Sequence, residues 1–138
     1  KKVRYLTIGG LAVNIYGYIR NTGDIDILIE DTSENRINLR AAFKQIGIGD
    51  FPQIETMHFV AGYTDFTISY DLRLDVMTSI KGLENVNFDE LLQNATIVYV
   101  KEVPVYFIDY DSLIIAKKAT NRLKDQLDIE ELNKLNNK

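Results

Sequence analysis

The sequence has no cysteine and no tryptophan, and it holds one histidine and two prolines among its 138 residues. A chain without cysteine forms no disulfide and no thiolate metal site, so a reducing compartment is open to it and we expect a cytoplasmic protein. No apolar run reaches the length of a membrane span and no signal peptide is visible, so we expect no membrane contact. The first residue is Lys1 instead of methionine, which leaves open whether residues precede it.

The sequence also lacks an excess of basic residues. Lys and Arg number 16 against 20 Asp and Glu, which gives a net charge of −4 at pH 7. A broad basic face for non-specific nucleic-acid binding is therefore excluded, whereas a local basic pocket is not.

Length and composition indicate one domain. With 46% hydrophobic residues the chain can bury a core of its own, and it shows no internal repeat, low-complexity tract or linker. We predict a single domain over residues 1–138, with a helical C-terminal part at about 110–137.

The spacing of apolar residues predicts both helices and strands. Helices are expected over residues 10–18, 31–46, 88–93, 112–120 and 122–135. Strands are expected over 24–30, 58–61, 66–70, 72–77, 96–100 and 104–108, the last two as a hairpin joined near Lys101 and Glu102, while residues 5–8 fit a strand or a helix end. This mixture predicts an α/β (α+β) fold, a mixed β-sheet flanked by helices.

One stretch, GGLAVNIYGYIRNTGDID from Gly9 to Asp26, concentrates polar chemistry. Gly9 and Gly10 carry no Cβ, so the backbone there can approach a ligand closely. In a strand, Asp24 and Asp26 point to the same face. Two such carboxylates repel each other unless a cation lies between them, and hard divalent cations take oxygen ligands of this kind. The alternative is turn chemistry, because residues 21–24 have the composition of a turn.

A third acid, Asp75, lies within Leu72–Met77, which alternates strictly and has leucine and valine on its other face. Asp75 is therefore either an ordinary surface-strand residue or part of a site. Together with Asp24 and Asp26 it gives three carboxylates that can hold one or two Mg²⁺ ions. Such ions bridge triphosphate oxygens and activate an attacking hydroxyl, whose proton the third acid can accept.

The order Gly9-Gly10, Asp24-Ile25-Asp26 and Leu74-Asp75-Val76 resembles the nucleotidyltransferase superfamily of DNA polymerase beta-like fold. Within it, GGLAVNIYGYIRNTGDIDILI resembles the bacterial branch of antibiotic nucleotidyltransferases and abortive-infection toxin nucleotidyltransferases. The later KKATNRLKDQLDIEEL resembles the same branch through Lys117, Arg122, Lys124, Asp125 and Asp128. The resemblance spans about residues 8–132. Gly10 departs from the pattern, because many members have a serine there whose hydroxyl contacts a phosphate.

The resemblance implies metal-dependent transfer of a nucleoside monophosphate from an NTP to a hydroxyl acceptor, with release of pyrophosphate. It assigns Asp24 and Asp26 to Mg²⁺ or Mn²⁺, and Asp75 to one metal ion and the acceptor proton. Gly9, Gly10, Arg20, Thr22, Lys117 and Arg122 are the nucleotide-binding candidates. The acceptor stays open among a small molecule, an RNA end and a protein side chain. The identity of the nucleobase of the NTP also stays open. A second copy of the chain or an antitoxin protein is a further candidate partner.

Several of these assignments have structural alternatives. Arg20 either pairs with phosphate or braces the acidic cluster through a salt bridge, and the bracing role is the favoured one. Lys117 and Arg122 either reach the phosphates or belong to a solvated helix face, and the spacing of Arg122, Asp125 and Asp128 permits local helix pairs. At the level of function, the alternative is a catalytically weak nucleotide-binding or toxin–antitoxin interaction module of the same fold. A structural domain with coincidental acids is the third reading.

Overall fold

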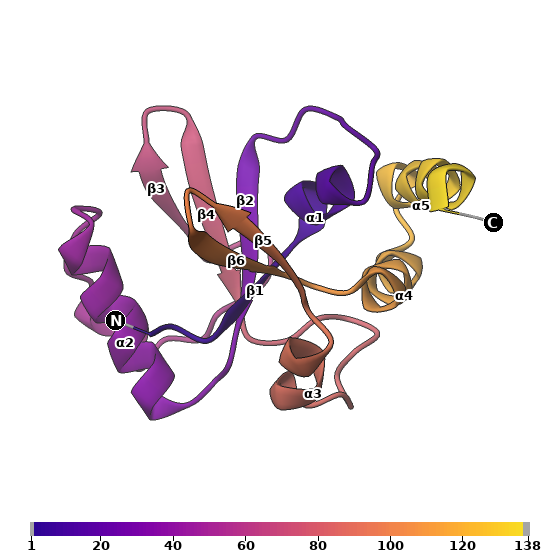
Figure 1. The fold of residues 1–138 in the computed structure, drawn as a ribbon. Coiled ribbons are helices and arrows are strands. Elements are labelled where there is room, and N and C mark those ends of the chain that lie inside the picture. The colour runs from indigo at the N-terminus through magenta and orange to yellow at the C-terminus, as the bar shows by residue number, and fades with distance from the viewer. Residues whose placement is uncertain (1, 137–138) are drawn as a thin grey trace.

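The computed structural model of the chain describes residues 2–136 (Figure 1). Its elements in chain order are β1 (Tyr5–Ile8), α1 (Gly9–Ile15), β2 (Asp24–Ile29), α2 (Ser33–Gln45), the 3₁₀ helix η1 (Pro52–Glu55), β3 (Asp65–Ser69), β4 (Leu72–Met77), α3 (Phe88–Gln93), β5 (Thr96–Val100), β6 (Val103–Phe107), α4 (Tyr110–Thr120) and α5 (Leu123–Asn136). The predicted C-terminal helical part is present as α4 and α5, and its last expected residue, 137, lies outside the described residues.

The strands form one six-stranded sheet in the order β3-β4-β2-β1-β6-β5. Strand β2 runs parallel to β4 and β1 runs parallel to β6, whereas the other neighbours are antiparallel. The predicted mixed sheet is therefore confirmed. Because parallel neighbours need a long crossover, the chain passes from β2 through α2 before it returns to β4.

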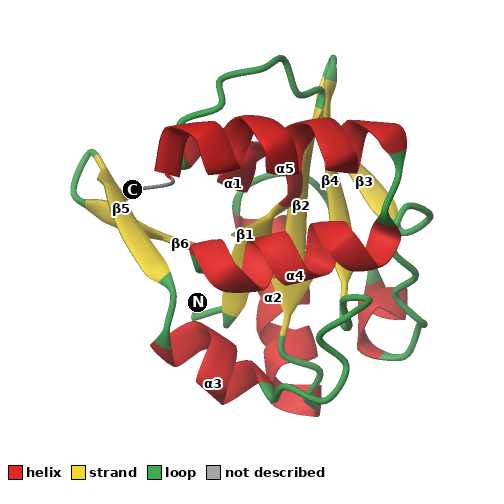
Figure 2. Ribbon diagram, turned by 90° about the vertical axis from the view of Figure 1, so that its right-hand side faces the viewer, coloured by secondary structure: helices red, strands yellow, loops and turns green. Residues whose placement is uncertain are grey.

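Helices cover both faces of the sheet. Helix α2 lies on one face, and α1, α4 and α5 lie on the other (Figures 1 and 2). A core centred on Leu39 and Phe43 of α2 fills the first side. A larger core, which includes Leu113 of α4 and Leu132 of α5, fills the second side.

Alternation along β2 and β4 decides which face carries the acids. Leu28 of β2 and Met77 of β4 both belong to the core beneath α1 and α4. Asp26 lies two residues before Leu28, and Asp75 lies two residues before Met77. Side chains two apart in a strand share a face, so both carboxylates point toward α1, α4 and α5.

Local signals in the sequence fix several element ends. Thr32 caps α2 by accepting a hydrogen bond from the Asn35 backbone N–H at 3.1 Å, which confirms the expected helix start. The β5–β6 hairpin turns at Lys101 and Glu102, which have φ values of 50° and 70°. Asn121, with φ 49°, ends α4 in the left-handed conformation, so the predicted break between the last two helices is also confirmed.

Two element predictions are wrong. Residues 58–61, expected to be a strand, form no strand, because the chain turns there: the carbonyl of Val60 accepts from the N–H groups of Tyr63 and Thr64. Helix α1 ends at Ile15 instead of residue 18, since Gly17 follows at φ 116°. Among the residues described, no helix combines the length and apolarity that crossing a bilayer requires.

Candidate active site

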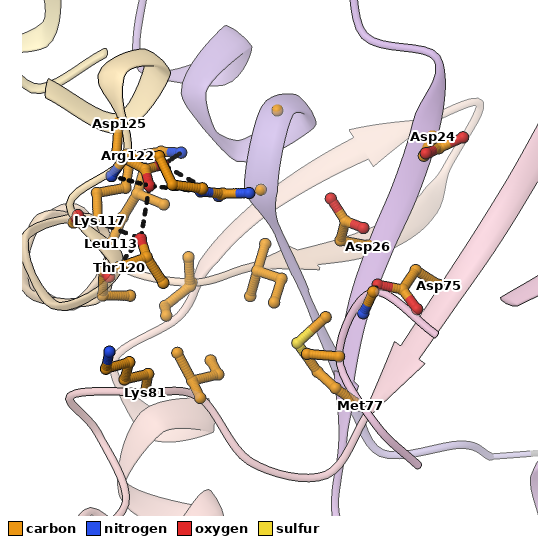
Figure 3. A pocket seen from close by; sticks show the side chains of 18 of the residues that line it. Asp24, Asp26, Asp75, Met77, Lys81, Leu113, Lys117, Thr120, Arg122 and Asp125 are labelled. Atoms are coloured by element: carbon orange, nitrogen blue, oxygen red, sulfur yellow. Dashed lines mark hydrogen bonds and ion pairs between the residues drawn. The ribbon is translucent and has the colours of Figure 1, made fainter. Parts of the chain in front are cut away.

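A cavity of about 560 Å³ lies between the acid-bearing face of the sheet and the helices α4 and α5 (Figure 3). Its volume is in the range of small-molecule sites. All predicted site residues except Thr22 line it: Gly9, Gly10, Arg20, Asp24, Asp26, Asp75, Lys117 and Arg122. Segments that are far apart in the sequence thus meet in one place.

The register of β2 and β4 sets Asp26 beside Asp75. The two residues are direct partners in this parallel pair, so their side chains project from neighbouring positions on one face. Asp24, two residues earlier, is paired with Arg73, and Figure 3 shows its carboxylate apart from the other two. Within residues 2–136, no three acidic or histidine side chains converge into a ready-made metal site. The metal role of the three-acid set therefore stays a prediction.

Burial and mutual repulsion perturb the two central acids. Desolvation, followed by the charges of Asp75 and Asp24, raises the pKa of Asp26 to about 6. Desolvation also raises the pKa of Asp75, against the effect of a hydrogen bond that its Oδ2 accepts from the Gly62 N–H at 2.9 Å. The other oxygen of Asp75, Oδ1, is buried without a hydrogen-bond partner. Both groups fit the oxygen ligands of a hard cation.

Gly9 makes room for Asp26. Its φ is +67°, and a Cβ at this position would lie 2.2 Å from Asp26 Oδ2. Only a residue without a side chain fits both the backbone conformation and the space. The backbone of Gly9 consequently lines the cavity directly against the carboxylate.

Thr22 packs over Gly10 and does not line the cavity. A Cβ on Gly10 would lie 2.6 Å from Thr22 Oγ1, and that hydroxyl donates to the Asp24 carbonyl at 3.1 Å. The observed role of Thr22 is thus to shape the chain before β2, and a nucleotide contact from it stays a prediction.

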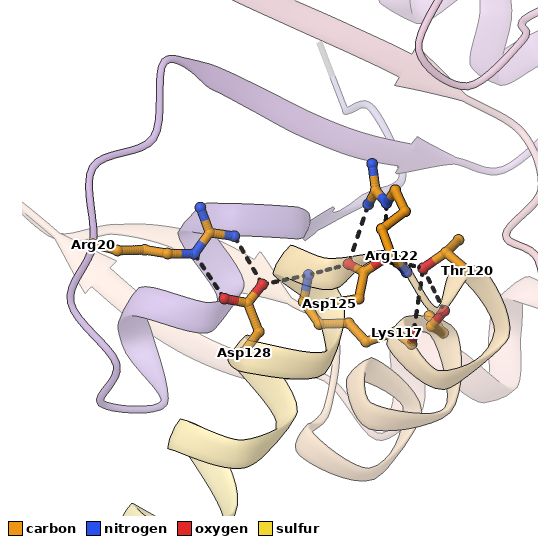
Figure 4. Close-up of polar contacts among 7 residues, drawn as sticks. Arg20, Lys117, Thr120, Arg122, Asp125 and Asp128 are labelled. Carbon is orange, nitrogen blue, oxygen red and sulfur yellow. Dashed lines mark hydrogen bonds and ion pairs between the residues drawn. The ribbon is translucent and has the colours of Figure 1, made fainter.

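A buried ionic network connects the loop after α1 to α4 and α5 (Figure 4). The guanidinium of Arg20 donates to both Asp128 oxygens at 2.9 Å, and Lys117 Nζ lies 2.9 Å from Asp128 and 3.2 Å from Asp125. Arg122 Nε donates to Asp125 at 2.7 Å. Lys117, Asp125 and Asp128 are 6%, 0% and 1% exposed, so the solvated-face alternative for Lys117 is wrong.

This network decides the role of Arg20 and fixes the charge of Asp125. Arg20 braces the fold, as favoured, although its partner is Asp128 of α5 and not the acids of the sheet. Burial alone would raise the pKa of Asp125, but hydrogen bonds from Arg122 and Thr120 hold it well below its usual range. The local pair of Arg122 with Asp125 is confirmed.

The lining residues that sequence reasoning missed include Gly62, Lys81 and Thr120. Thr120 Oγ1 donates to Asp125 at 2.7 Å, so it belongs to the network. Gly62 has φ +82° and donates its N–H to Asp75 from the turn that follows Val60. Lys81 follows β4, the strand that carries Asp75. A basic residue just past the end of this strand is the sequence feature that could have marked it as a site residue.

No protein-family model and no curated protein matches the chain. Several solved structures are similar to it, and two of them illustrate the likeness. The first is the lincosamide antibiotic adenylyltransferase LnuA in its lincomycin-bound form, with 13% identity, a TM-score of 0.56, and coverage of 95% of this chain and 86% of that chain. The second is the antibiotic-resistance factor ANT(2'')-Ia, with 18% identity, a TM-score of 0.58, and coverage of 96% and 74%. At these identities the likeness establishes the fold, which is the expected nucleotidyltransferase-like one.

Proposed function

We propose that this pocket transfers a nucleoside monophosphate from a nucleoside triphosphate to a hydroxyl acceptor. The observation that carries the proposal is the direct pairing of Asp26 with Asp75 in a pocket whose facing wall bears Lys117, Arg122 and Lys124. Carboxylates opposite cations are what a triphosphate and its divalent counterion require. The fold shared with an antibiotic adenylyltransferase supports the same reaction class.

The triphosphate would lie against the glycine turn and Arg122. Gly9 and Gly10 offer backbone at the cavity wall without side chains. Arg122 uses Nε and Nη2 on Asp125, and no bond from its Nη1 occurs within the described residues. Figure 3 shows the guanidinium directed into the pocket, where Nη1 can donate to phosphate oxygen. Lys117 adds a positive charge to the cavity wall, but its Nζ is paired with Asp125 and Asp128.

Asp75 would take the proton of the acceptor hydroxyl. In the proposed step the acceptor oxygen bonds to the α-phosphorus, the bond from this phosphorus to the pyrophosphate oxygen breaks, and the hydroxyl proton goes to Asp75. Its Oδ2 is held by Gly62, which leaves the unpartnered Oδ1 as the accepting atom. The raised pKa of Asp75 strengthens it as a base.

Asp26 and Asp75, together with Asp24, would hold Mg²⁺ or Mn²⁺. When bound, such an ion neutralises phosphate charge and favours the ionised acceptor. The acceptor is a small molecule, an RNA end or a protein side chain, each of which supplies a hydroxyl.

The test is pyrophosphate release from each NTP with Mg²⁺, in the presence of small hydroxylated compounds, RNA and proteins. Asp24→Ala and Asp26→Ala should lose both nucleotide binding and turnover. Asp75→Ala should keep much of the affinity and lose turnover by about 10²–10⁴-fold. Asp71→Ala is the matched control, because Asp71 is exposed in the turn between β3 and β4.

Two outcomes would redirect the proposal. Clear Mg²⁺-dependent NTP binding with no pyrophosphate release for any acceptor would indicate the nucleotide-binding or toxin–antitoxin interaction module. Unaltered turnover in Asp75→Ala would show that the base is a different residue.

A further inference from the structure

The chain turns sharply at residues 60–64, just before β3, and this turn forms part of the cavity wall. Its middle residue, Gly62, lines the cavity. The carbonyl of Val60 accepts hydrogen bonds from the N–H groups of Tyr63 and Thr64, at 2.9 Å and 3.0 Å. Backbone hydrogen bonds thus close the turn between its first and last residues.

The hydroxyl of Thr64 adds a second connection across this turn. Its Oγ1 accepts a hydrogen bond from the Val60 N–H at 2.7 Å. Thr64 is 7% exposed, whereas residues 60–63 are all exposed. Because the rest of the turn has little packing around it, local hydrogen bonds decide its shape.

The turn is attached to β4 at two consecutive residues. The carbonyl of Thr64 accepts from the Val76 N–H at 2.9 Å, and the Gly62 N–H donates to Asp75 Oδ2 at 2.9 Å. The first bond lies beside the antiparallel pairing of β3 with β4. The second reaches a carboxylate of the candidate site. The place of the Gly62 N–H relative to this carboxylate therefore depends on the shape of the turn.

The hydrogen bond from Gly62 distinguishes the two oxygens of Asp75. The torsion that rotates an aspartate carboxylate has a broad energy well, so the rotamer alone does not fix its orientation. Oδ2 is held by Gly62, and among the described residues Oδ1 is buried with no hydrogen-bond partner. Oδ1 is consequently the oxygen left for a cation or for the proton of the acceptor.

We propose that Thr64 is a positioning residue for Asp75, an inference that rests on the proposed nucleotidyl transfer. Its hydroxyl holds the turn in the shape in which the Gly62 N–H fixes Asp75 Oδ2 and leaves Oδ1 for the reaction. Thr64 itself does not line the cavity, so its effect passes through the backbone of the turn. The effect falls on turnover and not on nucleotide affinity, because without the hydroxyl the carboxylate stays in the pocket but loses its orientation.

A small set of substitutions separates the hydroxyl from the rest of the side chain. Thr64→Val removes the hydroxyl and keeps the branched shape, and Thr64→Ser keeps the hydroxyl. Thr67→Val, the same change at an exposed position of β3, is the matched control. Thr64→Ala, which also lacks the hydroxyl, takes the place of Thr64→Val if the valine variant does not fold.

The first measurement is an amide NMR spectrum of the protein without ligands, in which the Gly62 amide reports its hydrogen bond to Asp75. Asp75→Ala gives the position of this signal without the bond. Thr64→Val should move the signal most of the way toward that position. Thr64→Ser and Thr67→Val should leave it in place. This measurement does not depend on activity.

The second measurement is steady-state pyrophosphate release in Mg²⁺. Thr64→Val should lower kcat by about 10–100-fold and change the KM for the NTP by less than about threefold, since a reacting group is misplaced while binding is kept. Thr64→Ser and Thr67→Val should stay within about twofold of the wild type. In the Asp75→Ala background, Thr64→Val should cause no further loss, because no carboxylate remains to be positioned.

Each other result overturns the inference in a recognisable way. An unchanged Gly62 amide in Thr64→Val shows that the hydroxyl does not hold the turn. A displaced amide with wild-type kcat shows that the reaction does not need this hydrogen bond. An equal loss of turnover with and without Asp75, or a loss that Thr64→Ser shares, gives Thr64 a structural role only. A wild type that releases no pyrophosphate removes the proposed function and this inference together, whereas the first three results leave the proposed function intact.

Discussion

In the metal-free fold, burial and the neighbouring acids disfavour the ionised form of the Asp26 carboxylate. It shares its face of the sheet with Asp75, and the absence of a side chain at Gly9 leaves space for its carboxylate. Desolvation and the two neighbouring acids raise its pKa to about 6. Such an arrangement is typical of a site that binds a cation, because the bound ion removes the repulsion.

Replacing Asp26 by asparagine should stabilise the protein in EDTA. A raised pKa means that the folded state holds the proton more tightly, so the contribution of Asp26 to stability is fully present below about pH 4 and is lost as the pH rises through about 6. Asp26→Asn should therefore match the wild type at pH 4. At pH 7 its free energy of unfolding should be higher by about 1–2 kcal/mol, a value reduced for partial exposure.

Urea unfolding at pH 4, 5.5 and 7 measures this difference, with Asp71→Asn as the exposed control. A difference between Asp26→Asn and wild type that does not change with pH would show that Asp26 is not strained by its charge. The same variant should lose Mg²⁺-dependent NTP affinity, which links the stability gain to the site.

Gly9→Ala should damage both the fold and the site. The alanine has to adopt φ +67°. Its Cβ would lie 2.2 Å from Asp26 Oδ2, so the carboxylate has to move away. We expect a loss of about 1–2 kcal/mol from the backbone conformation alone, together with weaker NTP binding. Gly23→Ala is the matched control, because a Cβ there meets no atom within 4 Å. Equal stability and affinity of the two variants would contradict this account.

At the scale of elements, the network between α4, α5 and the loop after α1 fixes one wall of the pocket. Its arginine and lysine side chains meet two aspartates that are 0% and 1% exposed. Removing one partner of a buried ion pair leaves the other charge without compensation, which is far more destabilising than losing an exposed pair.

Asp128→Ala should lower the free energy of unfolding by about 3–5 kcal/mol, since it leaves Arg20 without its partner and Lys117 with Asp125 alone. Glu130→Ala, on the same helix, removes only an exposed contact 3.7 Å long with Lys134 and should change stability by less than about 0.5 kcal/mol. Guanidinium unfolding compares the two. Similar losses in both variants would mean that the network does not hold α5 in place.

The elements that the sequence predicted best are those with strong local signals. Capping at Thr32, alternation along Leu72–Met77 and the break at Asn121 depend on neighbouring residues alone. The residues around 58–61 were mistaken for a strand because their composition is apolar, whereas their turn is set by a hydrogen bond between Val60 and Thr64.

The site was predictable where chemistry is concentrated in one segment and unpredictable where distant segments meet. Asp24, Asp26 and Gly9 lie within one short stretch, and the alternation around Asp75 placed it on the right strand face. No pattern in the sequence connects Arg20 to Asp128 across 108 positions, so its partner could not be named. Lys81 likewise depends on how the segment after β4 packs against α4.

At the scale of the whole molecule, nucleotide and metal should stabilise the fold together. A ligand that binds only the folded state at 100 times its dissociation constant adds about 2.7 kcal/mol. We expect the NTP that binds the protein to raise the melting temperature by several degrees in Mg²⁺, and the same NTP in EDTA, or Mg²⁺ alone, to raise it much less. An equal rise with the NTP in EDTA would show that binding does not require the divalent cation.

The pairing of Arg20 with Asp128 also sets when the pocket can form during synthesis. A ribosome adds about 5–20 residues per second, so the 108 positions between them take about 5–20 s to make. For that time Arg20 has no Asp128, and the wall made by α5 does not exist. The pocket wall is completed only when α5 has left the ribosome. A nascent chain that carries all three acids but has not yet released α5 therefore has an incomplete pocket.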